Sequence, residues 1–325
     1  FQPAADGTPG VWEPVAGADA AAPARWRMCD NRTDYNACNF AVPDGGSEAE
    51  EHLCVSCRQT RLAPDLGKPE NLFRWTALES AKRRLYYTLA RLGLESIEGE
   101  AGPAFQFLED LPGEPPVLTG HADGLITVNV AEADDDERAR RRLALGEPYR
   151  TLLGHLRHES GHYFWDVLAL RGGQEEAFRA VFGDERQDYA QALEEHYARG
   201  PRADWQTAFV SAYAASHPWE DWAETWAHYL HMVDLLETAA SYQAQVTIPS
   251  AQGPQHTAAI NPLGEPAPDF DAMLLCWTPF TLLLNSLTRS LGQQDAYPFA
   301  LPPAALAKLR FVHDLVRSRT ALQKS

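Results

Sequence analysis

The chain has 325 residues, of which 45% are apolar, and its formal net charge is −17 at pH 7. Such a length can bury a large core and slightly exceeds the needs of one domain, so we expect a main domain plus a small appendage. The negative charge argues against nonspecific electrostatic binding to nucleic acid or to an anionic membrane surface. No uninterrupted apolar run approaches about 18 residues and no amino-terminal signal pattern is visible, which predicts a soluble, cytoplasmic protein.

The first 66 residues are expected to form an arm followed by a small metal-binding module. Residues 1–28 are rich in Ala, Pro and Gly, a composition that cannot offset the entropy of ordering a core, and this predicts a linker or flexible arm. Four cysteines then crowd together: Cys29, Cys38, Cys54 and Cys57. In a protein that is not exported, such a cluster is more typical of a zinc site than of disulfides.

Four thiolates around a tetrahedral zinc ion would allow residues 29–66 to fold without a core of their own. The spacing from Cys29 to Cys38 is wider than usual, so four ordinary thiols are the alternative. This module has more acidic than basic residues, which favours protein docking over nucleic acid binding. Cys276 stands alone among apolar residues and is interpreted as a core residue.

Residues 67–130 are expected to contain one long helix and a small sheet. The leucines between Trp75 and Leu92 recur at helical spacing. Residues 105–107 and 125–130 have the apolar and β-branched composition of strands. The second of these is either an edge strand that pairs with a substrate backbone or an ordinary core strand.

Residues 148–171 are expected to form a helix that carries a metal-binding motif, because apolar residues recur at helical spacing before Gly172-Gly173 ends the pattern. Within it, His158-Glu159-Ser160-Gly161-His162 places two imidazoles on the same side of the helix, where both can bind one ion. This is the His-Glu-x-x-His pattern of zinc hydrolases, in which the carboxylate, here Glu159, is the general base. Gly161 would let another element approach the helix closely. The alternative is an ordinary surface helix.

A catalytic zinc site normally has a third protein ligand, and residues 218–231 are its candidate source. This segment is predicted to be a helix rich in Trp and Ala, with a polar stripe formed by Glu220, Glu224, His228 and His231. A carboxylate on so apolar a helix needs a partner, such as a metal or a ligating imidazole. We assign Glu220 as the third ligand and Glu224 as the carboxylate that orients a ligating imidazole, and the reverse assignment stays open. His217 either acts near the transition state or caps the helix.

The two helices together resemble the Glu-zincin metallopeptidases. His158-Glu159-Ser160-Gly161-His162 followed by Glu220-Asp221-Trp222-Ala223-Glu224 is similar to the catalytic domain of anthrax lethal factor, whose glutamate ligand matches Glu220. In that relative a tyrosine seven residues before the ligand faces the substrate carbonyl, and Tyr213 stands at this position. The resemblance therefore implies that Tyr213 stabilises the oxyanion.

A second resemblance covers nearly the whole chain, namely to a bacterial zinc-binding metallopeptidase family with an amino-terminal zinc-ribbon module. The stretches that carry it are Cys38-Asn39-Phe40, residues 79–85, residues 155–163, residues 182–185 and residues 217–221. It implies a mainly α (α+β) fold, in which a zinc ribbon at residues 29–66 precedes a zincin-like metallopeptidase domain with a small sheet at residues 67–325. It also implies peptidase chemistry on a peptide or protein substrate, without naming that substrate.

These observations predict a zinc metallopeptidase with one catalytic and one structural zinc ion. Zinc bound by two imidazoles and a carboxylate would lower the pKa of its water and polarise the carbonyl, while Glu159 would take the water's proton. Two other functions stay open: a zinc hydrolase or amidase with a non-peptide substrate, and a non-catalytic interaction protein stabilised by zinc. Helices are expected near residues 270–284 and 302–322, with no functional meaning that the sequence reveals.

Overall fold

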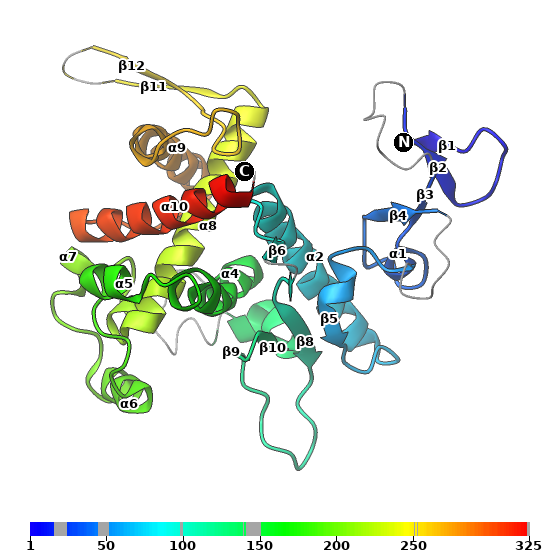
Figure 1. Ribbon diagram of the computed structural model, residues 1–325, viewed down its shortest axis with the longest axis horizontal. Helices are drawn as coiled ribbons and strands as arrows, with labels where there is room; N and C mark the ends of the chain where they lie inside the picture. The colour runs from blue at the N-terminus through cyan, green and yellow to red at the C-terminus, as the bar shows by residue number, and fades with distance from the viewer. Residues whose placement is uncertain are drawn as a thin grey trace. The chain divides into compact units, whose positions relative to one another are not determined.

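The computed structural model describes residues 1–15, 25–44, 52–97, 100–138, 140, 151–249, 251 and 253–323. These residues form two compact units (Figure 1). The first comprises Phe1–Tyr86 and Ile97–Ala139, and the second comprises Tyr87–Ser96 and Arg140–Ser325. Helices predominate and the sheets are small, so the α+β prediction is confirmed.

The first unit begins with a four-stranded sheet of order β1-β2-β3-β4. Its strands are β1 (Gln2–Pro3), β2 (Val11–Glu13), β3 (Trp26–Met28) and β4 (Ala41–Pro43), and all neighbours are antiparallel. Residues 1–28, expected to be a linker, therefore contribute three strands, although residues 16–24 lie outside the described part. The average composition of residues 1–28 did not reveal these strands, because it does not show where the apolar residues lie. In the structure Val11 is buried, and the rings of Phe1 and Trp26 lie 5.6 Å apart.

A second sheet of the first unit has the order β5-β8-β10-β9. It is formed by β5 (Thr60–Leu62), β8 (Ala104–Leu108), β9 (Gly120–Ala122) and β10 (Leu125–Asn129), while β6 (Ser96–Ile97) and β7 (Glu100–Ala101) are two shorter strands. Strand β10 pairs with β8 in parallel and with β9 in antiparallel orientation. The interpretation of residues 125–130 as an edge strand is thus wrong, because both sides of β10 are already hydrogen-bonded. Alternate residues of β8 and β10 are buried, as expected for strands with one face on a core.

Helices α1 and α2 also belong to the first unit. The short helix α1 (Asp30–Thr33) lies between the first two cysteines. The long helix α2 (Pro69–Arg91) covers all but the last of the predicted residues 75–92 and extends into the second unit at Tyr87. The leucines of α2 that the periodicity singled out, Leu78, Leu85 and Leu89, are buried.

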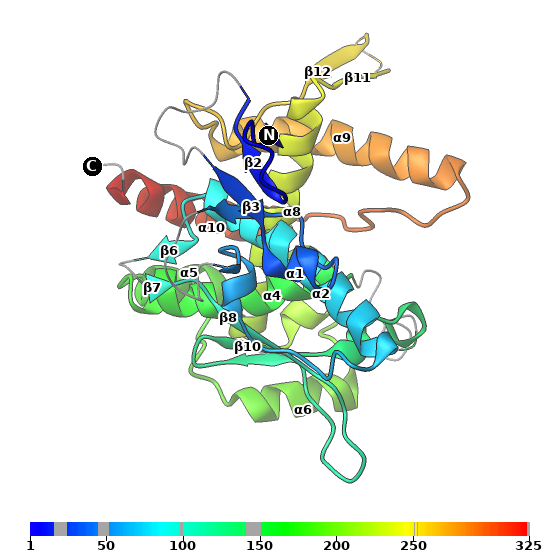
Figure 2. The same cartoon turned by 90° about the vertical axis from the view of Figure 1, so that its right-hand side faces the viewer.

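The second unit is almost entirely helical. Its helices are α4 (Leu152–Phe164), α5 (Glu175–Phe182), α6 (Tyr189–Arg199), α7 (Trp205–Ala208), α8 (Pro218–Ser241), α9 (Phe270–Ser290) and α10 (Pro303–Gln323). The strands β11 (Gln245–Ile248) and β12 (Gln255–Ala258) form a hairpin that projects beyond the end of α8 (Figures 1 and 2). Helix α4 starts after Thr151, whose side chain accepts a hydrogen bond from the Gly154 backbone N–H. The predicted start at Pro148 lies outside the described residues. A π-helical segment, Trp165–Leu170, continues α4.

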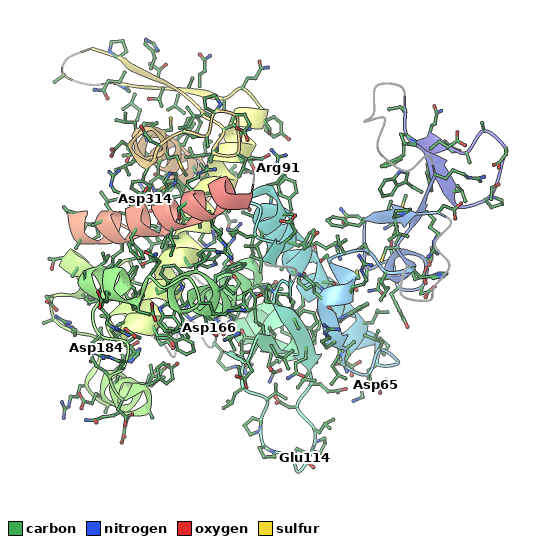
Figure 3. The ribbon with its side chains drawn as sticks, in the orientation of Figure 1. Asp65, Arg91, Glu114, Asp166, Asp184 and Asp314 are labelled. Atoms are coloured by element: carbon green, nitrogen blue, oxygen red, sulfur yellow. The ribbon has the colours of Figure 1, made fainter. Side chains whose placement is uncertain are left out.

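Helix α8 is the centre of this unit, since α4, α5, α9 and α10 all pack against it. Side chains fill the space between α4, α8 and α10 (Figure 3). Trp222, Trp226, Tyr229 and Leu230 of α8 are fully buried. The Trp- and Ala-rich sequence thus forms a core helix, and any polar group on it is held in a largely dry environment.

Helix α9 is, among the described helices, the one long and apolar enough to cross a membrane by length and composition alone. About a third of its most apolar stretch is buried within the protein. Core helices of soluble proteins meet the same criteria, and Phe270, Met273 and Trp277 of α9 are buried in this unit.

Candidate metal centres

Helices α4 and α8 bring two imidazoles and one carboxylate to a common point. Ligand atoms of His158, His162 and Glu220 all lie within 4.8 Å of one another. Glu220 Oε2 is 3.0 Å from His158 Nε2 and 3.6 Å from His162 Nε2. Glu220 is in the first turn of α8 and is 1% exposed. Two nitrogens and one oxygen are the donors that a catalytic zinc site requires.

A close approach of the two helices makes this convergence possible. A Cβ atom on Gly161 would lie 2.9 Å from Ala223 Cα, so only a glycine fits on α4 at this crossing. The Trp222 indole N–H donates to the Gly161 carbonyl over 2.8 Å, and the Trp226 indole N–H donates to Ser160 Oγ over 3.1 Å. The helix crossing is therefore fixed by sterics and by two buried hydrogen bonds.

Glu224 lies one turn beyond Glu220 and contacts the other side of the His158 ring. Its Oε1 is 2.8 Å from His158 Nδ1, and its Oε2 accepts a hydrogen bond of 2.6 Å from Ser211 Oγ. A hydrogen bond at Nδ1 fixes the ring orientation and leaves Nε2 facing Glu220. The geometry thus favours Glu220 over Glu224 as the partner of both Nε2 atoms.

The three donor groups fit a metal ion. Glu220 Oε2 is buried and takes no well-aligned hydrogen bond among the described residues, although both Nε2 atoms are near it. Burial raises the pKa of Glu220, but the imidazoles of His162 and His158 outweigh this and hold it well below its usual value. Burial lowers the pKa of His158, yet Glu220 and Glu224 raise it well above 6.5, so a metal ion would displace the proton of this ring when it binds. A buried carboxylate kept charged between two imidazoles is suited to a divalent cation.

The other predicted residues occupy different positions around this cluster. Glu159 is on α4 between the two histidines and is 8% exposed. Tyr213 begins a short 3₁₀ turn, Tyr213–Ala215, and its ring centroid is 5.9 Å from that of His158. Burial raises the pKa of Tyr213, so its hydroxyl stays a hydrogen-bond donor. His217 caps α8, because its Nδ1 accepts from the Trp219 backbone N–H.

Two histidines of the polar stripe lie outside the cluster. His228 Nδ1 is 2.6 Å from the Tyr297 hydroxyl, and His231 Nδ1 contacts the guanidinium of Arg157. Both rings therefore have partners within the second unit.

The four clustered cysteines form a second candidate metal centre, in the first unit. All are buried and reduced, and their sulfur atoms lie within 4.8 Å of one another. Three of these sulfurs accept backbone hydrogen bonds, from the N–H groups of Phe40, Cys54 and Cys57. Four converging sulfurs with backbone donors fit a tetrahedral structural zinc ion. Cys276 lies elsewhere and is buried against the carbonyl of Ala258.

The comparison with protein families agrees with this geometry. Residues 71–315 match the model of a family described as "Putative zinc-binding metallo-peptidase", which spans most of the chain. The chain belongs to this family. Residues 3–68 match a zinc-ribbon domain, which includes the four cysteines, the strands β2 and β3 and the last residue of β1.

This member of the family has relatives in mycobacteria. Proteins from Mycobacterium bovis and from two strains of Mycobacterium tuberculosis, all named as uncharacterized, are 41% identical to it over 284 residues. The matches cover 86% of this chain and 79% of each relative. No solved structure matches the chain.

Two hydroxyl groups that the sequence did not reveal also contact the carboxylates of this cluster. Ser211 bonds to Glu224, and the Tyr189 hydroxyl donates to Glu220 Oε1 over 2.6 Å. Both residues precede α8 in the chain: Tyr189 begins α6, and Ser211 lies between α7 and α8. Spacing on one helix cannot predict such partners, because they come from other parts of the fold.

Proposed function

We propose that this protein is a zinc-dependent metallopeptidase that hydrolyses a peptide or protein substrate with water, using Glu159 as the general base. The observation that carries this proposal is the convergence of His158, His162 and Glu220 at one buried point, with Glu159 on the same helix as the two histidines. In this proposal the three converging residues hold the zinc ion and Glu224 orients His158. When bound, zinc supplies Lewis-acid polarisation of the scissile carbonyl and of the attacking water.

Side chains of the protein transfer the proton and stabilise the oxyanion. Glu159 takes the proton of the attacking water and later gives it to the leaving amine, which preserves charge over the reaction. Tyr213 donates a hydrogen bond to the oxyanion, a contribution of about 3 kcal/mol. Its protonated hydroxyl and its place beside the His158 ring support this role. The four-cysteine centre is proposed to hold a structural zinc ion and to offer a surface for protein docking.

The test compares three variants on an unbiased peptide library, with and without a chelator. Glu159→Gln removes the base but none of the three proposed ligands, so we expect a metal-loaded protein with turnover reduced at least about 100-fold. His158→Ala is expected to lose both the catalytic metal and the activity. Glu176→Gln, at an exposed glutamate of α5, is the matched control and should behave as the parent.

Two results would refute the proposal. One is equal peptide cleavage by Glu159→Gln and the parent protein. The other is the absence of any chelator-sensitive cleavage by the zinc-loaded parent.

A further inference from the structure

Tyr189 is the first residue of α6, and its position is set by contacts outside that helix. Asp188 caps α6, since its side chain accepts a hydrogen bond from the Gln191 backbone N–H. No described residue of α6 is buried, and the helix lies at the edge of the unit in Figure 1. The Tyr189 ring instead packs edge-on against His217 and Trp219, with centroid distances of 5.3 and 5.8 Å.

These contacts direct the Tyr189 hydroxyl to the carboxylate of α8. The hydroxyl donates to Glu220 Oε1 over 2.6 Å, while Oε2 of the same group faces the imidazoles of His158 and His162. The two oxygens of Glu220 therefore have different partners. This division matters because a carboxylate can bind a metal ion through one oxygen or through both.

A catalytic zinc site needs a position that the protein does not fill. If both oxygens of Glu220 bound the ion, the second oxygen would compete for that position. We propose that Tyr189 is a positioning residue that restricts Glu220 to ligation through one oxygen and so keeps a coordination position open for water. This inference rests on the proposed function, because it assumes that Glu220 is the third ligand.

The alternative is that Tyr189 only anchors α6. The two roles differ in what they affect: an anchor contributes to folding stability, whereas a positioning residue alters the coordination of the metal. Tyr189→Phe separates them, since it removes one oxygen atom and retains the ring that packs on Trp219.

Three measurements on the full-length chain test the proposal, with Tyr242→Phe as the matched control because Tyr242 is 82% exposed. Competition with a chromophoric chelator should show zinc affinity about 10- to 100-fold weaker in Tyr189→Phe, the usual effect of losing a hydrogen bond to a metal ligand. Cobalt exchanged into the His158, His162 and Glu220 site should absorb visible light less strongly, as its coordination number rises. Thermal melting of the zinc-stripped variant should match that of the stripped parent.

The outcomes are distinct. An unchanged cobalt spectrum overturns the proposal, whether or not Tyr189→Phe melts earlier, and a loss of stability in the stripped variant then identifies Tyr189 as an anchor. The proposed function survives that result if Glu159→Gln is still metal-loaded and inactive. If His158→Ala retains the parent's full zinc content, the proposed function itself fails.

Discussion

Gly161→Ala tests whether the close helix approach builds the metal centre. Two effects of this substitution oppose each other. In the interior of a helix, alanine is favoured over glycine by about 1 kcal/mol. The substitution would therefore stabilise the protein if the added methyl group met no other atom. Overpacking of a buried contact costs about 1–3 kcal/mol. Here the new methyl group would lie 2.9 Å from Ala223 Cα, a backbone atom that cannot rotate away.

The steric cost is therefore expected near the upper end of that range, and we predict a net loss of about 2 kcal/mol in the free energy of unfolding. An ordinary contact begins at 3.4 Å, so the helices must separate by about 0.5 Å. Metal–ligand distances in proteins lie within about 0.2 Å of their standard values, and Glu220 is one turn from Ala223, so zinc affinity should fall as well.

Urea denaturation and chelator competition measure the two effects. Gly120→Ala is a control, because nothing lies within 4 Å of the added methyl group. If Gly161→Ala were more stable than the parent and bound zinc equally well, the close approach would not be what forms this site.

Other predictions concern charge, pH and metal content. Lys308 Nζ lies 2.6 Å from Asp221 Oδ2 and both side chains are buried. Lys308→Met should cost about 3–5 kcal/mol in urea denaturation because it leaves a buried carboxylate without its cation, and Lys308→Met/Asp221→Leu should recover most of this loss. Burial favours the neutral ring of His313 and lowers its pKa from 6.5 to about 4. The contribution of this ring to the free energy of unfolding is therefore fully present above about pH 6.5 and is lost as the pH falls toward 4. The stability of the parent should decrease over this interval by up to about 3 kcal/mol more than that of His313→Gln, and equal pH profiles would exclude this role. Metal analysis should find two zinc ions per parent chain and one after Cys54→Ser, whereas loss of both would show that the two centres are not independent.

The sequence by itself determined the parts of the protein that depend on local periodicity. The spacing of His158 and His162 fixed both imidazoles on one face of a helix, because each residue turns an α-helix by about 100°. The same reasoning predicted α2 and α8, and local composition predicted the strands β8 and β10. The crowding of four cysteines likewise indicated a common centre, since so small a segment has few other ways to fold.

Tertiary structure alone decided which groups meet across elements. Glu220 and Glu224 have equivalent places on one stripe of α8, and the crossing at Gly161 brings Glu220 to the Nε2 atoms and Glu224 to Nδ1. Tyr189 and Ser211 reach these carboxylates from separate segments, and the pairing of β9 placed β10 inside its sheet. Periodicity defines the face of each element, but the partner of that face depends on the distance and angle at which the elements pack, which no single segment encodes.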